Sequence, residues 1–218
     1  MTSQKISFDL ELTNKIFKAN LGSLISVSRD SIIEQETNFQ IFIDKLSKEE
    51  VDENWLDKSA HYSNIDWILL NSILLSSFSF FEHHVFALCR IVEDRSNNRI
   101  QIENINGRGI FKFCNYLFLV GQIQNADKTK KVWQEIIYFQ KVRNLIAHNG
   151  GIMLTDPTKK LENHECYNFL RKNNVIMAGS LGHIRIKDIS FIEVFRDLTA
   201  EISDKLTYEI AENYKNSR

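Results

Sequence analysis

The stretch that most limits the possible folds is the apolar run from Ile65 to Val92. Its apolar residues fall on nearly every face of a helix, so we predict a long central helix that other helices cover all round. Asp66, Asn71 and the triplet Glu82-His83-His84 interrupt the run with polar groups. Because a membrane span avoids such interruptions, we expect a buried helix of a soluble protein.

Helical periodicity continues through the rest of the chain. The sequence has one Pro and eight Gly among 218 residues, and this shortage of helix breakers favours long helices. Apolar residues recur at intervals of three and four and predict further helices over 31–47, 110–120, 132–147 and 188–210. We therefore predict an all-α bundle of four to five helices in a single domain, 1–218. Its core spans about 65–206, and a helical N-terminal extension spans 1–63.

One segment departs from this pattern, the irregular insert 152–187. Asn173-Asn174 and the glycines at 179 and 182 bracket Val175–Ala178, and the alternating run His183–Ile186 follows. Two short apolar runs separated by turn residues are typical of a β-hairpin. The sequence thus predicts a small hairpin directly before the last helix.

The segment Lys141–Gly151 carries the most distinctive chemistry. It closes an amphipathic helix, and Asn149-Gly150-Gly151 supplies residues that tolerate positive φ, so the helix should stop at or just after His148. Asn144 and His148 lie four apart on one face of the last turn, and Arg143 flanks that face. A guanidinium, a carboxamide and an imidazole are therefore predicted to meet at a helix C-terminus.

These three groups suit chemistry on a phosphodiester. An arginine offers a planar fork of donors to phosphate oxygens and keeps its charge. A histidine takes or gives a proton near neutral pH, and an asparagine adds neutral hydrogen bonds. Nothing in this set demands a metal or another cofactor. On spacing alone the same residues also fit a helix C-terminus without any catalytic role. A histidine is favoured there by the negative end of the helix dipole, and Asn-Gly readily adopts the left-handed conformation that ends a helix.

The Arg-x4-His motif, with Asn directly after the Arg and at the end of a helix in an all-helical chain, resembles the HEPN superfamily. Many HEPN proteins are metal-independent endoribonucleases of toxin–antitoxin and antiviral defence systems. The resemblance implies that Arg143, Asn144 and His148 form the catalytic site, with two protomers bringing their copies together. It also implies a HEPN-like bundle.

The expected function is therefore that of an endoribonuclease, in which the 2′-hydroxyl of the RNA attacks the neighbouring phosphate. The active form is expected to be a homodimer. The resemblance also implies a toxin or an abortive-infection effector that an antitoxin or regulatory protein restrains. We expect Lys141, Asn149 and Lys131 to bind substrate. A net charge of −1 argues against non-specific coating of nucleic acid but permits a local basic site. No signal peptide is visible at residues 1–5, and three cysteines lack Cys-x-x-Cys spacing, so we expect a cytoplasmic protein.

Two alternatives remain open. In a non-catalytic helical module that binds a protein or a nucleotide, Arg143 pairs with a carboxylate such as Glu82, and His148 only caps its helix. A zinc enzyme is the less favoured alternative, because its candidate ligands lack paired spacing. Those candidates are His83, His84, His164 and Cys166.

Overall fold

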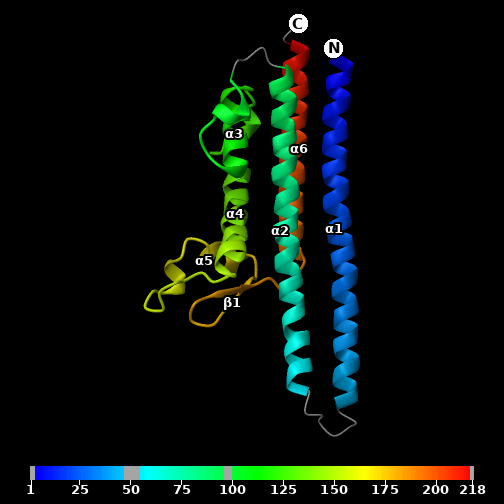
Figure 1. Cartoon of the computed structure of the whole chain (residues 1–218), viewed down its shortest axis with the longest axis vertical. Coiled ribbons are helices and arrows are strands. Elements are labelled where there is room, and N and C mark those ends of the chain that lie inside the picture. Colours follow the sequence, from blue (N-terminus) through cyan, green and yellow to red (C-terminus); the bar gives the residue numbers. More distant parts are fainter. Residues whose placement is uncertain (1–2, 47–54, 96–99, 217–218) are drawn as a thin grey trace. The chain divides into compact units, whose positions relative to one another are not determined.

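The structure, a computed structural model, describes residues 3–46, 55–95 and 100–216 (Figure 1). Within these ranges it is mostly helical, with six α-helices and a two-stranded hairpin directly before the last helix, which confirms the predicted all-α fold and its hairpin. The helices are α1 (Ser3–Leu46), α2 (Trp55–Arg95), α3 (Gly109–Leu119), α4 (Lys131–Asn149), α5 (Tyr167–Lys172) and α6 (Ser190–Asn216). The strands are β1 (Ile176–Ala178) and β2 (His183–Arg185), and three 3₁₀ turns are η1 (Ile102–Asn104), η2 (Gln124–Ala126) and η3 (Leu161–Asn163).

The chain divides into two compact units that are interleaved in sequence. The first comprises Met1–Gly22, Ser77–Gln140 and Val194–Arg218, and the second comprises Ser23–Ser76 and Lys141–Glu193. The helices α1, α2, α4 and α6 each contribute residues to both units. Each unit is described by itself below.

Aromatic side chains from four helices form the core of the first unit. Phe195 of α6 stacks on Phe78 of α2 with 5.6 Å between ring centroids, and it meets Phe139 of α4 at 5.1 Å. Phe81 of α2 lies 6.0 Å from Phe17 of α1 and 6.0 Å from Trp133 of α4. All these side chains are almost fully buried. The last helix thus packs on the long apolar helix, as its periodicity predicts.

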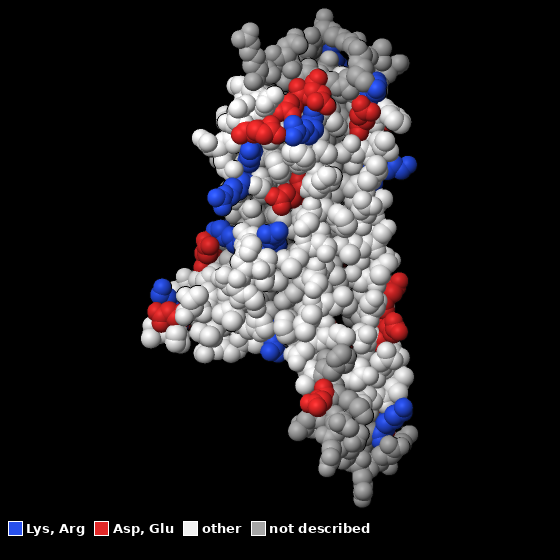
Figure 2. Space-filling model, viewed as in Figure 1, with Lys and Arg blue, Asp and Glu red and all other residues white. Residues whose placement is uncertain are grey.

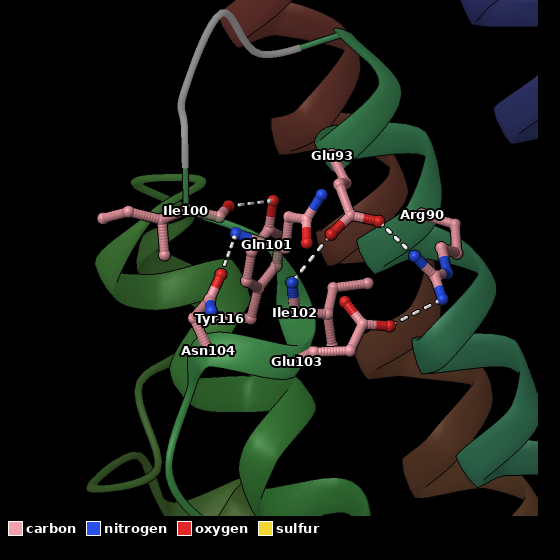
Figure 3. A network of polar contacts seen from close by, with 8 residues as sticks. All are labelled: Arg90, Glu93, Ile100, Gln101, Ile102, Glu103, Asn104 and Tyr116. Carbon is pink, nitrogen blue, oxygen red and sulfur yellow. Dashed lines mark hydrogen bonds and ion pairs between the residues drawn. The ribbon is translucent and has the colours of Figure 1, made fainter.

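A polar network ties the end of α2 to η1 (Figure 3). Glu93 accepts a hydrogen bond from the backbone N–H of Ile102 at 2.7 Å and pairs with Arg90. Arg90 also reaches Glu103 at 2.8 Å. These contacts fix the start of the segment that leads into α3.

The N-terminal helix differs from the prediction. Within the helical N-terminal extension the periodicity predicted a helix only over 31–47, whereas α1 runs without a break from Ser3 to Leu46. The helix continues because Leu21, Ile25 and Ser28 keep one face buried across the junction. A single glycine, Gly22, lowers helix propensity by only about 1 kcal/mol and does not end a helix that is packed on both sides of it.

The long helix α2 is also less enclosed than we expected. Ile68 is 50% exposed and Phe80 is 38% exposed, so the helix is not covered all round. Its segment Asn64–Asp94 is long and apolar enough to cross a membrane by length and composition, and 39% of its most apolar window is buried. Core helices of soluble proteins meet the same criteria, so this one segment is weak evidence for a membrane span.

In the second unit a buried amide joins α2 to the hairpin. The strands pair antiparallel with Met177 opposite Ile184. Asn71 donates to the carbonyl of Ile184 at 3.2 Å and accepts from the N–H of Ile186 at 3.4 Å. The segment after α4 also reaches the hairpin, because Gly151 accepts a hydrogen bond from the N–H of Ile184 at 2.9 Å. The hairpin is thus anchored from two sides.

Candidate active site at the C-terminal end of α4

The predicted helix stop is present at the end of α4. The helix ends at Asn149, and Gly150 and Gly151 adopt φ values of +59° and +80°. The N–H of Gly151 reaches back to the carbonyl of Leu145 at 2.9 Å, which satisfies one of the free carbonyls of the last turn. The site residues therefore sit on a helix end that the following turn fixes.

Arg143 and Asn144 are in direct contact. The Nη1 of Arg143 donates to the Oδ1 of Asn144 at 3.1 Å. Arg143 is half-buried, whereas Asn144 and His148 are exposed. Asn144 and His148 are one helical turn apart and share a face. A charged donor group, an amide and an accessible imidazole are thus available to one ligand at this helix end.

The three expected substrate-binding residues have different surroundings. Lys141 forms an ion pair with Glu165, with 2.6 Å between Nζ and Oε2, so part of its charge is compensated. Asn149 is exposed as the last residue of α4, and its carbonyl accepts from the N–H of Ile152 at 3.0 Å. Lys131 is exposed at the opposite end of α4 and belongs to the first unit.

The hairpin brings further side chains to the turn after α4. A Cβ on Gly151 would lie 3.2 Å from the Cδ2 atom of His183, so the imidazole of β2 contacts this turn directly. Trp67 of α2 touches the same imidazole, with 4.8 Å between ring centroids. Neither His183 nor Trp67 was among the site residues that the sequence predicted. The alternation of basic and apolar residues from His183 to Lys187 is the sequence signal that places the basic side chains of this strand on one face.

The candidate zinc ligands are distributed over separate places. His84 bonds to Ser203 in the first unit, with 2.5 Å between Nε2 and Oγ, whereas the Nδ1 of His164 accepts from the N–H of Cys166 in the second unit at 3.1 Å. Among residues 3–46, 55–95 and 100–216, no three His, Cys, Asp or Glu side chains are grouped so that they could hold a metal ion.

Glu82, the carboxylate we considered as a partner for Arg143, lies in the first unit against α3. Its Oε1 is 2.5 Å from where a Cβ on Gly109 would lie, and the amide nitrogen of Gln140 is 3.9 Å from that same point. Figure 2 shows positive and negative side chains interspersed on one face of the molecule, where most of the surface carries no charge.

Comparison with known proteins gives no match: neither a protein-family model, nor a curated protein, nor a solved structure is similar to this chain. The resemblance to the HEPN superfamily therefore rests on Arg143, Asn144 and His148 and on the helix that carries them.

Proposed function

We propose that the chain is a metal-independent endoribonuclease of the HEPN type. The observation that carries this proposal is the hydrogen bond from Arg143 to Asn144 beside the exposed imidazole of His148, at a helix end held by Gly151. A guanidinium fork, an amide donor and a proton-transfer group in one accessible place are what the cleavage of a phosphodiester needs.

The reaction uses the 2′-hydroxyl of RNA as its nucleophile. His148 takes the proton as the 2′-oxygen bonds to phosphorus, and the bond from phosphorus to the 5′-oxygen breaks. Arg143 stabilises the charge that builds on the phosphoryl oxygens, and Asn144 orients the phosphate or the ribose. The products carry a 2′,3′-cyclic phosphate and a 5′-hydroxyl.

The departing 5′-oxygen needs a proton from a second group. A second copy of the chain supplies it through its own His148, so the active form is a homodimer. A ribonuclease that attacks cellular RNA must be restrained, and we infer a role as a toxin or antiviral effector with an antitoxin or regulatory partner.

The test is incubation of the purified protein with total cellular RNA in EDTA, followed by mapping of the fragment ends. Wild type should cut and leave cyclic phosphates, whereas Arg143→Ala and His148→Ala should not. His83→Ala is a matched control, because His83 is also an exposed histidine but lies on α2 in the first unit, whereas His148 belongs to the second unit. Cleavage by all four proteins would point to a contaminating nuclease. RNA left intact by wild type, with unharmed growth on expression, would overturn the proposal.

A second candidate function is a helical module that binds a protein partner. Phe8, Leu12 and Ile16 lie four apart on α1 and are 63%, 44% and 50% exposed, which gives the first unit an open apolar stripe. Under this alternative His148 only caps α4, so His148→Ala lowers the free energy of unfolding and removes no activity. Thermal melts of this variant beside the RNA assay separate the two functions.

A further inference from the structure

The second strand of the hairpin has one apolar and one basic face. Ile184 and Ile186 are fully buried, whereas the residues that alternate with them are His183, Arg185 and Lys187. Because successive side chains of an extended strand point to opposite sides, the three basic residues share the other face. We call these three residues the basic face of β2; its last member, Lys187, is the second residue after the end of the strand.

Trp67 of α2 lies against this basic face. The guanidinium carbon of Arg185 is 5.3 Å from the centroid of the indole ring, and His183 meets the ring edge-on at 80°. Trp67 is itself fixed, since its indole N–H donates to the Oδ1 of Asn64 at 2.9 Å. The aromatic ring therefore holds two of the three basic side chains in defined positions while all of them keep some exposure.

The basic face begins beside the candidate catalytic helix end. Residue 152 forms a bridge with His183, and the N–H of Ile184 bonds to the carbonyl of Gly151. Gly151 is also the residue whose N–H closes the last turn of α4. The basic face of β2 thus starts, within the same unit, at the turn that directly follows the end of α4.

The charge of the basic face is only partly compensated. Asp66 is the acidic residue whose ionisation Lys187 influences: burial raises the pKa of the Asp66 carboxyl, and the ammonium of Lys187 opposes that shift. The Nε of Arg185 is buried and has no hydrogen-bond partner among the described residues. Asp66 thus offsets part of the charge of Lys187, and the guanidinium of Arg185 has a buried N–H without a hydrogen-bond partner among the described residues. Both features favour an additional anionic ligand.

We propose that the basic face of β2, supported by Trp67, binds the RNA strand that flanks the scissile phosphate. Arg185 and Lys187 contact phosphate oxygens of the neighbouring nucleotides, and His183 borders the path from the helix end. This inference rests on the proposed ribonuclease function and assigns it a substrate-binding surface outside the Arg-x4-His helix. Phosphate contacts of this kind add affinity and position the strand without reading its sequence.

The experiment measures binding of a fluorescently labelled single-stranded RNA to the full chain carrying His148→Ala, which prevents cleavage during the titration. Arg185→Gln and Lys187→Gln are each introduced into this background, and affinity is followed by anisotropy at several salt concentrations. Each substitution should weaken binding about fivefold or more and reduce the salt dependence by about 0.7 in log–log slope, as expected for one lost phosphate contact on a single strand.

Two matched variants give the experiment its controls. Lys205→Gln removes an exposed lysine of α6 that pairs with Glu201, and it should leave RNA affinity unchanged. Asp66→Asn removes the carboxylate beside the basic face and should strengthen binding. Lys187 is exposed, so its substitution tests the proposal even if Arg185→Gln fails to fold.

The outcomes separate this inference from the function on which it rests. If Arg185→Gln or Lys187→Gln folds and binds RNA as tightly as the parent, the proposed surface is wrong while the ribonuclease proposal stands. If the parent binds no RNA and wild type cuts none, the proposed function fails and the surface fails with it. If Lys205→Gln weakens RNA binding as much as Arg185→Gln and Lys187→Gln do, the loss of affinity reflects only the change in net charge, and the proposal is overturned as well.

Discussion

The guanidinium of Arg143 donates a hydrogen bond to the side-chain oxygen of Asn144, the next residue along α4, at 3.1 Å. Neighbouring side chains of a helix usually diverge, so this contact orients both groups toward one side of the helix end. The bond uses one of the two lone pairs of the Asn144 oxygen, and in the proposed function the NH₂ group of Asn144 is the part that would donate to a substrate oxygen. The two side chains therefore form one hydrogen-bonded pair.

A first prediction follows for the kinetics of RNA cleavage. Arg143→Gln should lower kcat/KM about 100-fold or more, because it removes charge stabilisation at the phosphoryl oxygens. Asn144→Ala should lower kcat/KM about tenfold. The double variant should be little slower than Arg143→Gln alone, because groups that act as a unit give non-additive losses. Initial rates on a fluorogenic RNA substrate measure this cycle. Strictly multiplicative losses would show that the two side chains act independently.

A second prediction concerns the amide that anchors the hairpin. Asn71→Ala removes a buried donor and acceptor and leaves the carbonyl of Ile184 and the N–H of Ile186 without that partner. The free energy of unfolding should fall by about 2–3 kcal/mol. Ser72→Ala is the matched control, because the exposed Ser72 bonds only to its own helix, and it should change stability by less than about 0.5 kcal/mol.

Urea unfolding measures both variants, and hydrogen exchange over 176–186 locates the effect. If Asn71→Ala and Ser72→Ala unfold at the same urea concentration, the hydrogen bonds to the hairpin contribute no net stability.

Local signals in the sequence were sufficient for much of the fold and for the helix end that carries the candidate site. The stop after His148 depends on Asn149 and two glycines that follow it in the chain, and the hairpin depends on turn residues beside each strand. Such features are encoded within a few residues, so periodicity and turn chemistry predict them.

Contacts between distant segments were not predictable in the same way. The stacking of Arg185 on Trp67 joins residues far apart in the sequence, and no local pattern indicates which helix the basic face of β2 meets. The continuity of α1 was missed for a related reason: Gly22 and the surrounding polar residues weaken the local pattern, and packing restores the helix. Tertiary packing decided both cases.

A third prediction concerns acid stability. His84 is almost fully buried, stacks on Phe17 with 4.5 Å between ring centroids, and bonds to Ser203. Burial, together with the nearby positive charges of His83 and Lys18, lowers its pKa to about 4 from 6.5, and the carboxylate of Asp204 opposes the shift only in part. In the unfolded chain the imidazole takes up a proton near pH 6.5, whereas in the folded chain it stays neutral down to about pH 4.

The unfolded state therefore binds more protons between these values, and the free energy of unfolding falls as the pH drops from 6.5 to 4, by about 3 kcal/mol in total. Urea unfolding at a series of pH values measures the slope. His84→Gln should flatten this part of the profile, because its amide can still form a hydrogen bond with Ser203 but does not titrate. His83→Gln removes one of the nearby positive charges but leaves the buried imidazole in place, so it should reduce the slope only in part. An unchanged slope in His84→Gln would assign the acid sensitivity to other groups.

The last prediction concerns the two glycines after α4, which share a positive φ but differ in their surroundings. A Cβ on Gly150 would meet nothing within 4 Å, whereas a Cβ on Gly151 would lie 3.2 Å from the imidazole of His183. Gly150→Ala should therefore cost only the strain of a left-handed backbone, about 1 kcal/mol. Gly151→Ala should cost about 2–3 kcal/mol, since the imidazole must also move from its place between the turn and Trp67.

The same pair tests whether the hairpin's position matters for the proposed cleavage. Gly151→Ala displaces His183 and the adjoining strand, so it should weaken RNA binding as well as stability, while Gly150→Ala should leave RNA affinity within about twofold of the parent. Urea unfolding and the anisotropy titration in the His148→Ala background give the two readouts. Equal losses of unfolding free energy in both variants would mean that the imidazole of His183 can move away from the new methyl group without destabilising the fold. A stability loss in Gly151→Ala without any change in RNA affinity would separate the anchoring of the hairpin from substrate binding.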